Sequence, residues 1–515
     1  MKTLNRLKIF VLLVSVFVIS CKKQLDIPSR TSLDAALALT TKAGMEAAVS
    51  SVYSVLKSER LYGRDMFSVA EAMADDAFAN GRSSRLLGEN RNTSGAHMAN
   101  WTTSYGAINE INLNLAAIPG VGDATAADKT RWEGELKFLR ALYYFDLVKC
   151  YSYIPTYIVS GQNKGGVVLN LQGFNSASAA ASYFPSRATI AECYAQIMSD
   201  LNAASSLLAP SGRYPGVTGV TAAMARNYAS KHAALALGSR VALYEGQWVR
   251  ADSFATAAIT LSGGIGAMTD TNSYVAGWRV ADHPEGIFQV WYATLGENLG
   301  VNTSLAATHT TLSAPGNWAS TRQGQGDLVL NAFLIGQLGI TGHPFSTTLT
   351  ASSPPPTLTY SNDIRNRLFE WGVNAAGHYV ECTKWMGKNG SPNWDNTVVL
   401  RWPELYLNRA EARYQSGDQA GAWADLNFLR ARRYKGFVVP GTPLTGQALL
   451  DEILKQRLLE FAFEGHRFFD LKRYGLPIIK TNPAVNMPAT DFRLLAAIPQ
   501  SNIDGNLNMQ QNFGY

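Results

Sequence analysis

Apolar residues recur at three- and four-residue intervals along much of the chain, which is the spacing of one face of an α-helix. This pattern predicts helices over residues 41–57, 101–115 and 131–151. It is equally clear from Leu449 to Tyr474, where Gly465 interrupts the apolar stripe and predicts a turn between two helices. We therefore expect a mostly α-helical protein.

Charged residues within 449–474 are spaced for contact along a helix. Arg457 lies three residues before Glu460, and Glu464 lies three residues before Arg467. Opposite charges at this spacing can meet on a helix surface, so we expect an ion-pair ladder along the rim of the helix–turn–helix. His466 stands alone, and we interpret it as a core or surface imidazole rather than as a ligand or base.

Two later stretches share one design, in which a helix closes with tyrosine, turns at a glycine and is followed by a helix of small residues. They cover residues 229–261, with Tyr244 and Gly246, and residues 402–433, with Tyr414 and Gly417. Small residues let antiparallel helices approach closely, and such pairs must stack to bury their open faces. The strict 34-residue period is not kept, but the register predicts a tetratricopeptide-like helical-repeat scaffold.

Residues 262–400 have a different character. They are rich in Gly, Ser, Thr, Asn and Pro, show weak helical periodicity, and carry scattered tryptophans. We predict an irregular, loop-rich binding region, because loops held on a rigid scaffold often carry binding residues. The body of the chain, residues 41–515, is thus divided into an N-terminal part (41–261), a loop-rich middle (262–400) and a C-terminal part (401–515).

The first 20 residues have the pattern of an export signal. A basic start precedes an apolar run from Ile9 to Ile19, which is too short to span a bilayer. The run ends in Val18-Ile19-Ser20-Cys21, which resembles the bacterial lipobox. That resemblance implies cleavage before Cys21, acylation of this cysteine, effectively permanent membrane attachment and a tether within residues 21–40. An ordinary secretory signal with an incidental cysteine is the alternative.

Composition and motifs narrow the function classes. The formal net charge of +6 is spread over 515 residues without a long basic run, so we do not expect nucleic-acid binding. The four cysteines form no CxxC pair and no zinc-ligand cluster with histidine, and a disulfide among Cys150, Cys193 and Cys382 stays open. No hydrolase, metalloprotease or nucleotide-binding motif occurs. We therefore expect no catalytic residues, no metal and no cofactor.

Three segments resemble the SusD/RagB family of lipid-anchored nutrient-binding proteins of the Bacteroidetes outer membrane. They are LEFAFEGHRFFDLKR from Leu459 to Arg473, LRALYYFDLV from Leu139 to Val148, and the C-terminal stretch 494–515. The resemblance implies a non-catalytic, surface-exposed outer-membrane protein that captures an oligosaccharide or polysaccharide. It also implies a SusC-like TonB-dependent transporter as partner. The helical scaffold would face this transporter, and the protein would close over the transporter mouth as a lid.

The same resemblance places part of a shallow ligand site on the loop after the family's second N-terminal helix, which here is the Asn/Gly/Arg/Ser-rich loop that follows residues 69–76 and runs to about Asn100. Sugar faces lie on aromatic rings, while their hydroxyls bond to Asp, Asn and Arg. For any single tryptophan, packing in the core or in a loop is the alternative. The candidates on the loop are Asp75, Asp76, Arg82, Arg85, Asn90 and Trp101, and the middle region adds Trp278, Trp291, Tyr292 and Trp318.

Other functions stay open at this stage. The ligand could be a peptide or another nutrient, and the sequence names neither the glycan nor its linkage. A surface glycoside hydrolase would need two carboxylates about 5–10 Å apart in a cleft, whereas the adjacent Asp75 and Asp76 suit capping or loop hydrogen bonds better. A purely structural helical scaffold is the remaining alternative.

Overall fold

The computed structural model describes residues 39–210, 222–316, 318, 324–342, 354–374 and 377–515. The predicted signal segment 1–20, the lipidated Cys21 and nearly all of the tether 21–40 lie outside these residues. Within them, no helix combines the length and the apolar character needed to cross a membrane.

The helices predicted in the N-terminal part are confirmed. α7 begins five residues before the predicted start at 131, because Thr125 and Asp128 form a capping box. α9 was not expected, although Thr189 and Glu192 form the same kind of cap before it. The helices here are α3 (Lys42–Val55), α4 (Asp65–Met73), α5 (Leu87–Asn90), α6 (Trp101–Ala117), α7 (Ala126–Tyr151), α8 (Ala177–Ala180) and α9 (Ile190–Leu207).

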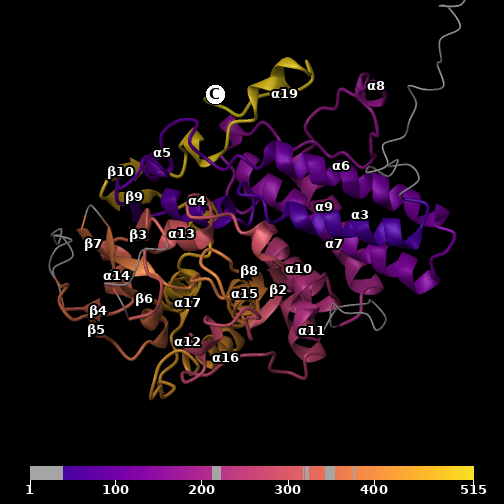
Figure 1. The fold of residues 1–515 in the computed structure, drawn as a ribbon. Helices are drawn as coiled ribbons and strands as arrows, with labels where there is room; N and C mark the ends of the chain where they lie inside the picture. The colour runs from indigo at the N-terminus through magenta and orange to yellow at the C-terminus, as the bar shows by residue number, and fades with distance from the viewer. Residues whose placement is uncertain (1–38, 211–221, 317, 319–323, 343–353, 375–376) are drawn as a thin grey trace, which may run out of the picture.

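The two helix pairs are also confirmed, as α10 (Lys231–Glu245) with α11 (Trp248–Leu261) and α15 (Trp402–Gln415) with α16 (Gln419–Arg430). Gly246 and Gly417 turn the chain with φ of 78° and 89°, a left-handed conformation that favours glycine. α6 packs on α7, α7 on α9, α9 on α10, α10 on α11, and α11 on α15 (Figure 1). The helix pairs therefore stack side by side, as the small residues on their returning helices predicted.

The middle region is irregular, as predicted, and contributes most of the strands. The described residues form five two-stranded antiparallel sheets, β1–β3, β2–β8, β4–β5, β6–β7 and β9–β10. Their bounds are β1 (Ala77–Ala79), β2 (Gly286–Val290), β3 (Leu328–Leu330), β4 (Ile340–Thr341), β5 (Thr359–Tyr360), β6 (Phe369–Asn374), β7 (Gly377–Cys382), β8 (Thr397–Arg401), β9 (Ile478–Thr481) and β10 (Ala484–Met487). Short helices α12 (Tyr274–Gly277), α13 (Leu305–His309) and α14 (Ala332–Gln337) lie among them.

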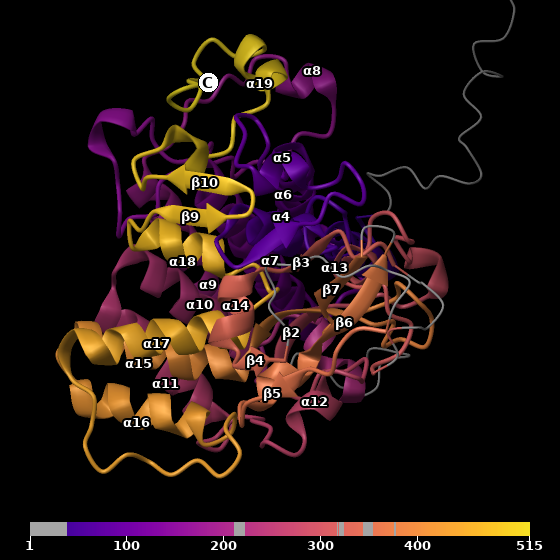
Figure 2. The same ribbon diagram turned by 90° about the vertical axis from the view of Figure 1, so that its left-hand side faces the viewer.

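The C-terminal part returns to the N-terminal one. α17 (Gly446–Phe461) and α18 (Arg467–Arg473) form the predicted helix–turn–helix, followed by the β9–β10 hairpin and α19 (Gln500–Asp504). Figure 2 shows α18, β9 and β10 beside α4 and α5. Gly465, with φ of 75°, lies so close to α4 that a Cβ there would be 2.4 Å from the Met66 carbonyl oxygen. This turn thus packs the C-terminal part of the chain against α4 in the N-terminal part.

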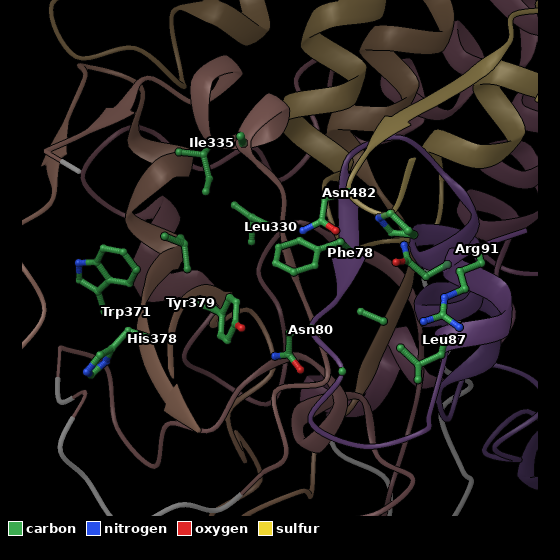
Figure 3. A pocket seen from close by; sticks show the side chains of 16 residues that line it. Phe78, Asn80, Leu87, Arg91, Leu330, Ile335, Trp371, His378, Tyr379 and Asn482 are labelled. Atoms are coloured by element: carbon green, nitrogen blue, oxygen red, sulfur yellow. The ribbon is translucent and has the colours of Figure 1, made fainter. Parts of the chain in front are cut away.

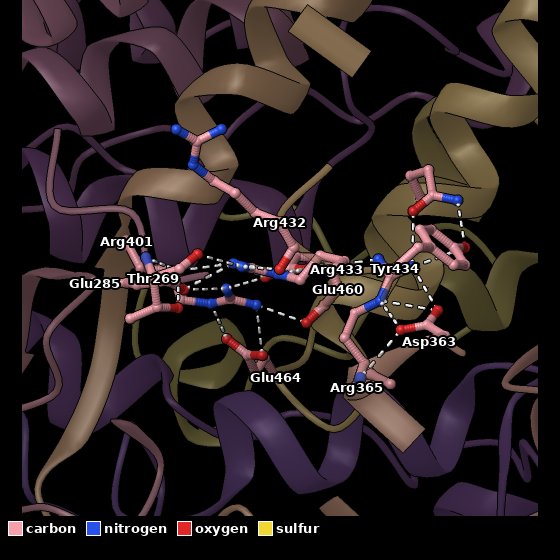
Figure 4. A network of polar contacts seen from close by, with 12 residues as sticks. Thr269, Glu285, Asp363, Arg365, Arg401, Arg432, Arg433, Tyr434, Glu460 and Glu464 are labelled. Atoms are coloured by element: carbon pink, nitrogen blue, oxygen red, sulfur yellow. Dashed lines mark hydrogen bonds and ion pairs between the residues drawn. The ribbon is translucent and has the colours of Figure 1, made fainter. Parts of the chain in front are cut away.

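The predicted ion-pair ladder within 449–474 is wrong. Glu460 accepts from Arg433 Nε at 2.9 Å, and Glu464 accepts from Lys384 Nζ at 2.6 Å. Arg457 pairs with Asp470 at 3.1 Å. Because Arg457, Glu460 and Glu464 are buried, where an ion needs a partner, they pair with other elements rather than with their neighbours on the helix, as Figure 4 shows for Glu460 and Glu464.

The three cysteines of the body and His466 are packed into the fold without a disulfide or an ionised imidazole. Cys150, Cys193 and Cys382 are free and buried, so no disulfide links them. The His466 ring stacks on Phe461, with 4.3 Å between ring centroids. Burial, followed by the nearby Arg240, lowers the pKa of His466 well below its usual value, so the imidazole is neutral and serves in packing.

Candidate ligand-binding site

A cavity of about 280 Å³ lies where all three parts of the body meet. We call it the junction pocket. β1 and α5 bring the N-terminal part to it, β3, α14 and the β6–β7 hairpin bring the middle, and the turn between β9 and β10 brings the C-terminal part. Figure 3 shows Phe78 and Tyr379 between Trp371 and His378 on one side and Arg91 on the other.

Strand pairing fixes the aromatic residues of the junction pocket. Phe78 lies opposite Val329 in the β1–β3 ladder, and Tyr379 lies opposite Gly372 in the β6–β7 hairpin. The Phe78 and Tyr379 rings meet edge to face, with 5.7 Å between centroids. Both side chains are half-buried, so each keeps a face available to a ligand.

A second aromatic group borders the same pocket. The His378 ring lies 5.3 Å from Trp318 and 6.4 Å from Trp371, measured between centroids. Trp371 donates its indole Nε1–H to the Pro356 carbonyl at 2.7 Å, which fixes its orientation. Trp318, one of the candidates from the sequence, thus reaches the edge of the junction pocket through His378.

Polar groups complete the lining. Asn90 is buried and donates to the carbonyls of Ala72 and Ala77, while Asn80 donates to the Gly326 carbonyl at 2.6 Å. Asn482, at the β9–β10 turn, is exposed. Among the described residues that line the junction pocket, none is Asp or Glu, so this cavity offers aromatic rings and amides rather than a pair of catalytic carboxylates.

Four of the loop candidates, Asp75, Asp76, Arg82 and Arg85, are close to the junction pocket in the sequence but do not line it. Asp75 forms an ion pair with Arg467 at 2.7 Å, and Arg85 forms one with Asp327. Arg82 donates to the Gln325 carbonyl at 3.4 Å. Asp76 is fully buried, and burial followed by the charge of Asp75 raises its pKa to about 7.

Lys480 connects the C-terminal hairpin to this loop. Its Nζ donates to the carbonyls of Ala72 and Asn90, both at 2.7 Å. Burial lowers the pKa of Lys480 to about 7, opposed by the negative charges of Asp76 and Asp75. These bonds hold the two walls of the junction pocket together.

The remaining candidates lie elsewhere. Trp101 borders a separate cavity of about 650 Å³ together with Tyr105, Tyr183 and residues of α19. Trp278 is fully buried, 5.5 Å from Trp385 between ring centroids. Trp291 borders a third cavity, of about 200 Å³, and Tyr292 is buried, with its hydroxyl directed at the Lys57 carbonyl. The structure therefore does not bring these four residues into the junction pocket.

Several lining residues were not expected from the sequence. Phe78, Arg91, Trp371, Tyr379 and Asn482 all border the junction pocket. Two signals in the sequence could have pointed to them. In residues 369–374, FEWGVN, apolar side chains alternate with polar ones or glycine, as in a strand, and Asn482-Pro483 is a typical turn dipeptide.

Comparison with known proteins gives the same family from both halves of the chain. A model described as SusD family matches residues 356–515, and one described as starch-binding, associating with outer membrane, matches residues 10–243. The starch-binding protein SusD of Bacteroides thetaiotaomicron is 37% identical over 127 residues, which is 23% of this chain and 21% of SusD. The match thus spans about a fifth of the length of that relative.

Solved structures show the same fold over nearly the whole chain. A SusD superfamily protein from Bacteroides thetaiotaomicron has a TM-score of 0.73 at 25% identity and covers 92% of this chain and 99% of its own. A laminarin-binding SusD-like protein has a TM-score of 0.67 at 23% identity and covers 92% and 100%. Two models of this family match the two halves of the chain, and the fold is shared over nearly its whole length. The chain therefore belongs to the SusD/RagB family, whose members are non-catalytic binding proteins.

Proposed function

We propose that this protein binds an oligosaccharide or polysaccharide in the junction pocket. The observation that carries the proposal is the meeting of Phe78 and Tyr379 with the amides of Asn80 and Asn482 in one cavity. Aromatic faces suit the C–H patches of sugar rings, and amides both donate to and accept from hydroxyls. The starch-binding SusD and the laminarin-binding relative bind glycans, which supports a glycan here.

Affinity electrophoresis of the full chain, in gels containing a panel of polysaccharides, tests this function. We expect one glycan to retard the protein, Tyr379→Ala to abolish the retardation, and Tyr379→Phe to retain most of it because the ring remains. Trp291→Ala is the matched control, since Trp291 borders a different cavity. If no glycan retards the protein, a peptide or another nutrient becomes the better candidate ligand.

The same proposal includes anchoring in the outer membrane through acylated Cys21, with exposure at the cell surface. It is supported by the lipobox-like sequence and by the description of the family model that matches residues 10–243. Cys21→Ser should move the protein out of the membrane fraction and abolish incorporation of labelled palmitate. Continued labelling of that variant would contradict the proposal.

Delivery of the glycan to a SusC-like TonB-dependent transporter completes the proposal. In it, this protein acts as a non-catalytic lid on the transporter. The surface of α11 and α16 suits the contact, because Val249 on α11 and Val438 after α16 are 73% and 81% exposed. Aspartate at both positions should reduce co-purification of the transporter. Leu507→Asp is the control, since Leu507 is 98% exposed after α19, away from α11 and α16 in Figure 1.

A further inference from the structure

We propose that the junction pocket selects a negatively charged glycan, one that carries a carboxylate or a sulfate, and that Arg91 binds this charge. The inference rests on the proposed function of glycan binding and adds the chemical class of the sugar.

The lining of the junction pocket has one sign of charge. Among the described residues around it, Arg91 is the one permanently charged side chain, and neither Asp nor Glu is present. The other polar side chains are neutral amides, a tyrosine hydroxyl and the His378 imidazole, which lies 3.2 Å from the Gly372 carbonyl. A ligand in this cavity therefore meets a cation that no lining carboxylate offsets.

Arg91 differs from the arginines around it. Its side chain is exposed, and within the described part of the chain its guanidinium forms no ion pair or hydrogen bond. By contrast, Arg85 is paired with Asp327, Arg467 with Asp75, and Arg493 with Asp491. The guanidinium donors of Arg91 are thus available to a ligand.

Carboxylates near the lining strands do not cancel this charge. Asp75, Asp327 and Glu370 lie next to or within these strands, and each already has an arginine partner. Asp76 and Glu381 are buried, and burial raises the pKa of each to about 7, so each is partly protonated near neutral pH. Buried Lys480, whose pKa burial lowers to about 7, is partly charged near neutral pH and brings no negative charge to this side.

Glu89 lies in α5, two residues before Arg91, which follows the end of this short helix, and no ion pair joins the two side chains among the described residues. The guanidinium donors of Arg91 are therefore not taken up by Glu89.

The chemistry of arginine sets the ligand class. A guanidinium presents a planar fork of donors that matches the two oxygens of a carboxylate or sulfate, and such charge-assisted bonds are stronger than bonds to a neutral hydroxyl. Figure 3 shows Arg91 across the cavity from Trp371, with Phe78 and Tyr379 between them. A sugar ring held on the aromatic side chains can thus extend an anionic substituent toward Arg91.

Isothermal titration calorimetry of the full chain with matched polymers tests the inference. The probes are polygalacturonate and its carboxyl-reduced form, and κ-carrageenan and its desulfated form, so that each anionic polymer has a neutral counterpart. We expect at least one anionic polymer to bind more tightly than its neutral counterpart, with affinity falling as salt rises. Arg91→Gln should weaken that binding about ten-fold, and Arg91→Lys should lose less because it keeps the charge.

Arg367→Gln is the matched control, because Arg367 is exposed and lies over the Tyr360 ring outside the junction pocket. Equal binding of charged and neutral forms, together with unchanged affinity of Arg91→Gln, overturns the inference but leaves the proposed glycan binding intact. Failure of every polymer, charged or neutral, removes the proposed function and the inference with it.

Discussion

Arg467 donates from both Nε and Nη2 to the carboxylate of Asp75, at 2.7 and 2.8 Å. This two-point contact joins α18 to the residues directly after α4, across nearly the whole sequence. Both side chains are largely buried, with 18% and 14% exposed. A bidentate ion pair of this kind is strong and fixes geometry, so it holds the C-terminal part against the loop that carries one wall of the junction pocket.

We expect Arg467→Ala and Asp75→Ala each to lower the free energy of unfolding by about 1–3 kcal/mol, since each leaves a largely buried charge without its partner. The double variant should lose less than the sum of the two. Urea unfolding of the four proteins measures this coupling. Simple additivity would show that the contact contributes nothing specific to stability.

Glu460 lies at the centre of a larger network. It is fully buried and contacts Arg401, Arg433 and Arg365. Although burial alone would raise its pKa, these three guanidiniums hold the pKa of Glu460 well below its usual range. Glu460→Gln should therefore destabilise the protein by about 3–5 kcal/mol, because it leaves buried arginines without their counter-ion.

Glu133→Gln is the matched control for this change. Glu133 pairs with Lys137 at 2.9 Å on the surface of α7, and its side chain is 42% exposed. An exposed pair of this kind contributes less than about 1 kcal/mol. Thermal or urea unfolding should separate the two variants clearly, and equal losses would contradict the importance of burial.

The scaffold could be predicted because its signals are local. Apolar spacing identified α3, α6, α7 and α17, and the glycines at 246 and 417 marked the turns of the helix pairs. Local spacing failed for the charges in α17 and α18. There, Glu464 and Arg467 have complementary charges at helical spacing, but each found a stronger partner elsewhere in the fold.

The candidate site could be predicted only in part, for the same reason. The resemblance led to the loop after α4, and Asn90 does line the junction pocket. The Phe78–Tyr379 contact, however, joins residues that only the β1–β3 and β6–β7 ladders bring together. Likewise, Trp278 looks like a loop tryptophan in the sequence, but its packing against Trp385 buries it.

Asp76 should make stability depend on pH. Its pKa of about 7 in the folded protein lies above the unfolded value of about 4, so the folded state binds a proton more tightly. The stabilisation of the folded state that this tighter proton binding provides is fully present below about pH 4 and is lost as pH rises through 7. Asp76→Asn, which stays neutral, should gain stability relative to wild type by up to about 4 kcal/mol between pH 4 and 8.

Urea unfolding at several pH values measures this difference, with Asp451→Asn as the control. Asp451 is exposed on α17 and accepts from Gln447. The unfolding free energy of Asp451→Asn should differ little from that of wild type at every pH, because the surroundings of an exposed carboxyl change little on unfolding. A flat difference for Asp76→Asn as well would show that Asp76 is ionised in the folded protein.

The last prediction compares Gly465, in the turn between α17 and α18, with Gly417, in the turn between α15 and α16. The two glycines have similar backbone conformations but different surroundings. Gly465 and Gly417 have φ of 75° and 89°, and alanine in this conformation costs about 1–2 kcal/mol at either position. A Cβ at Gly417 would meet nothing within 4 Å. A Cβ at Gly465 would lie 2.4 Å from the Met66 carbonyl oxygen, and backbone cannot move aside as a flexible side chain can.

Gly465→Ala should therefore cost more free energy of unfolding than Gly417→Ala, by at least about 2 kcal/mol, since overpacking against backbone adds to the strain. It should also weaken glycan binding, because α4 leads directly into β1 and Phe78 of the junction pocket. Urea unfolding and calorimetry of both variants measure these effects. Equal losses of unfolding free energy at the two glycines would mean that the close approach of Gly465 to α4 does not stabilise the contact between the C-terminal and N-terminal parts.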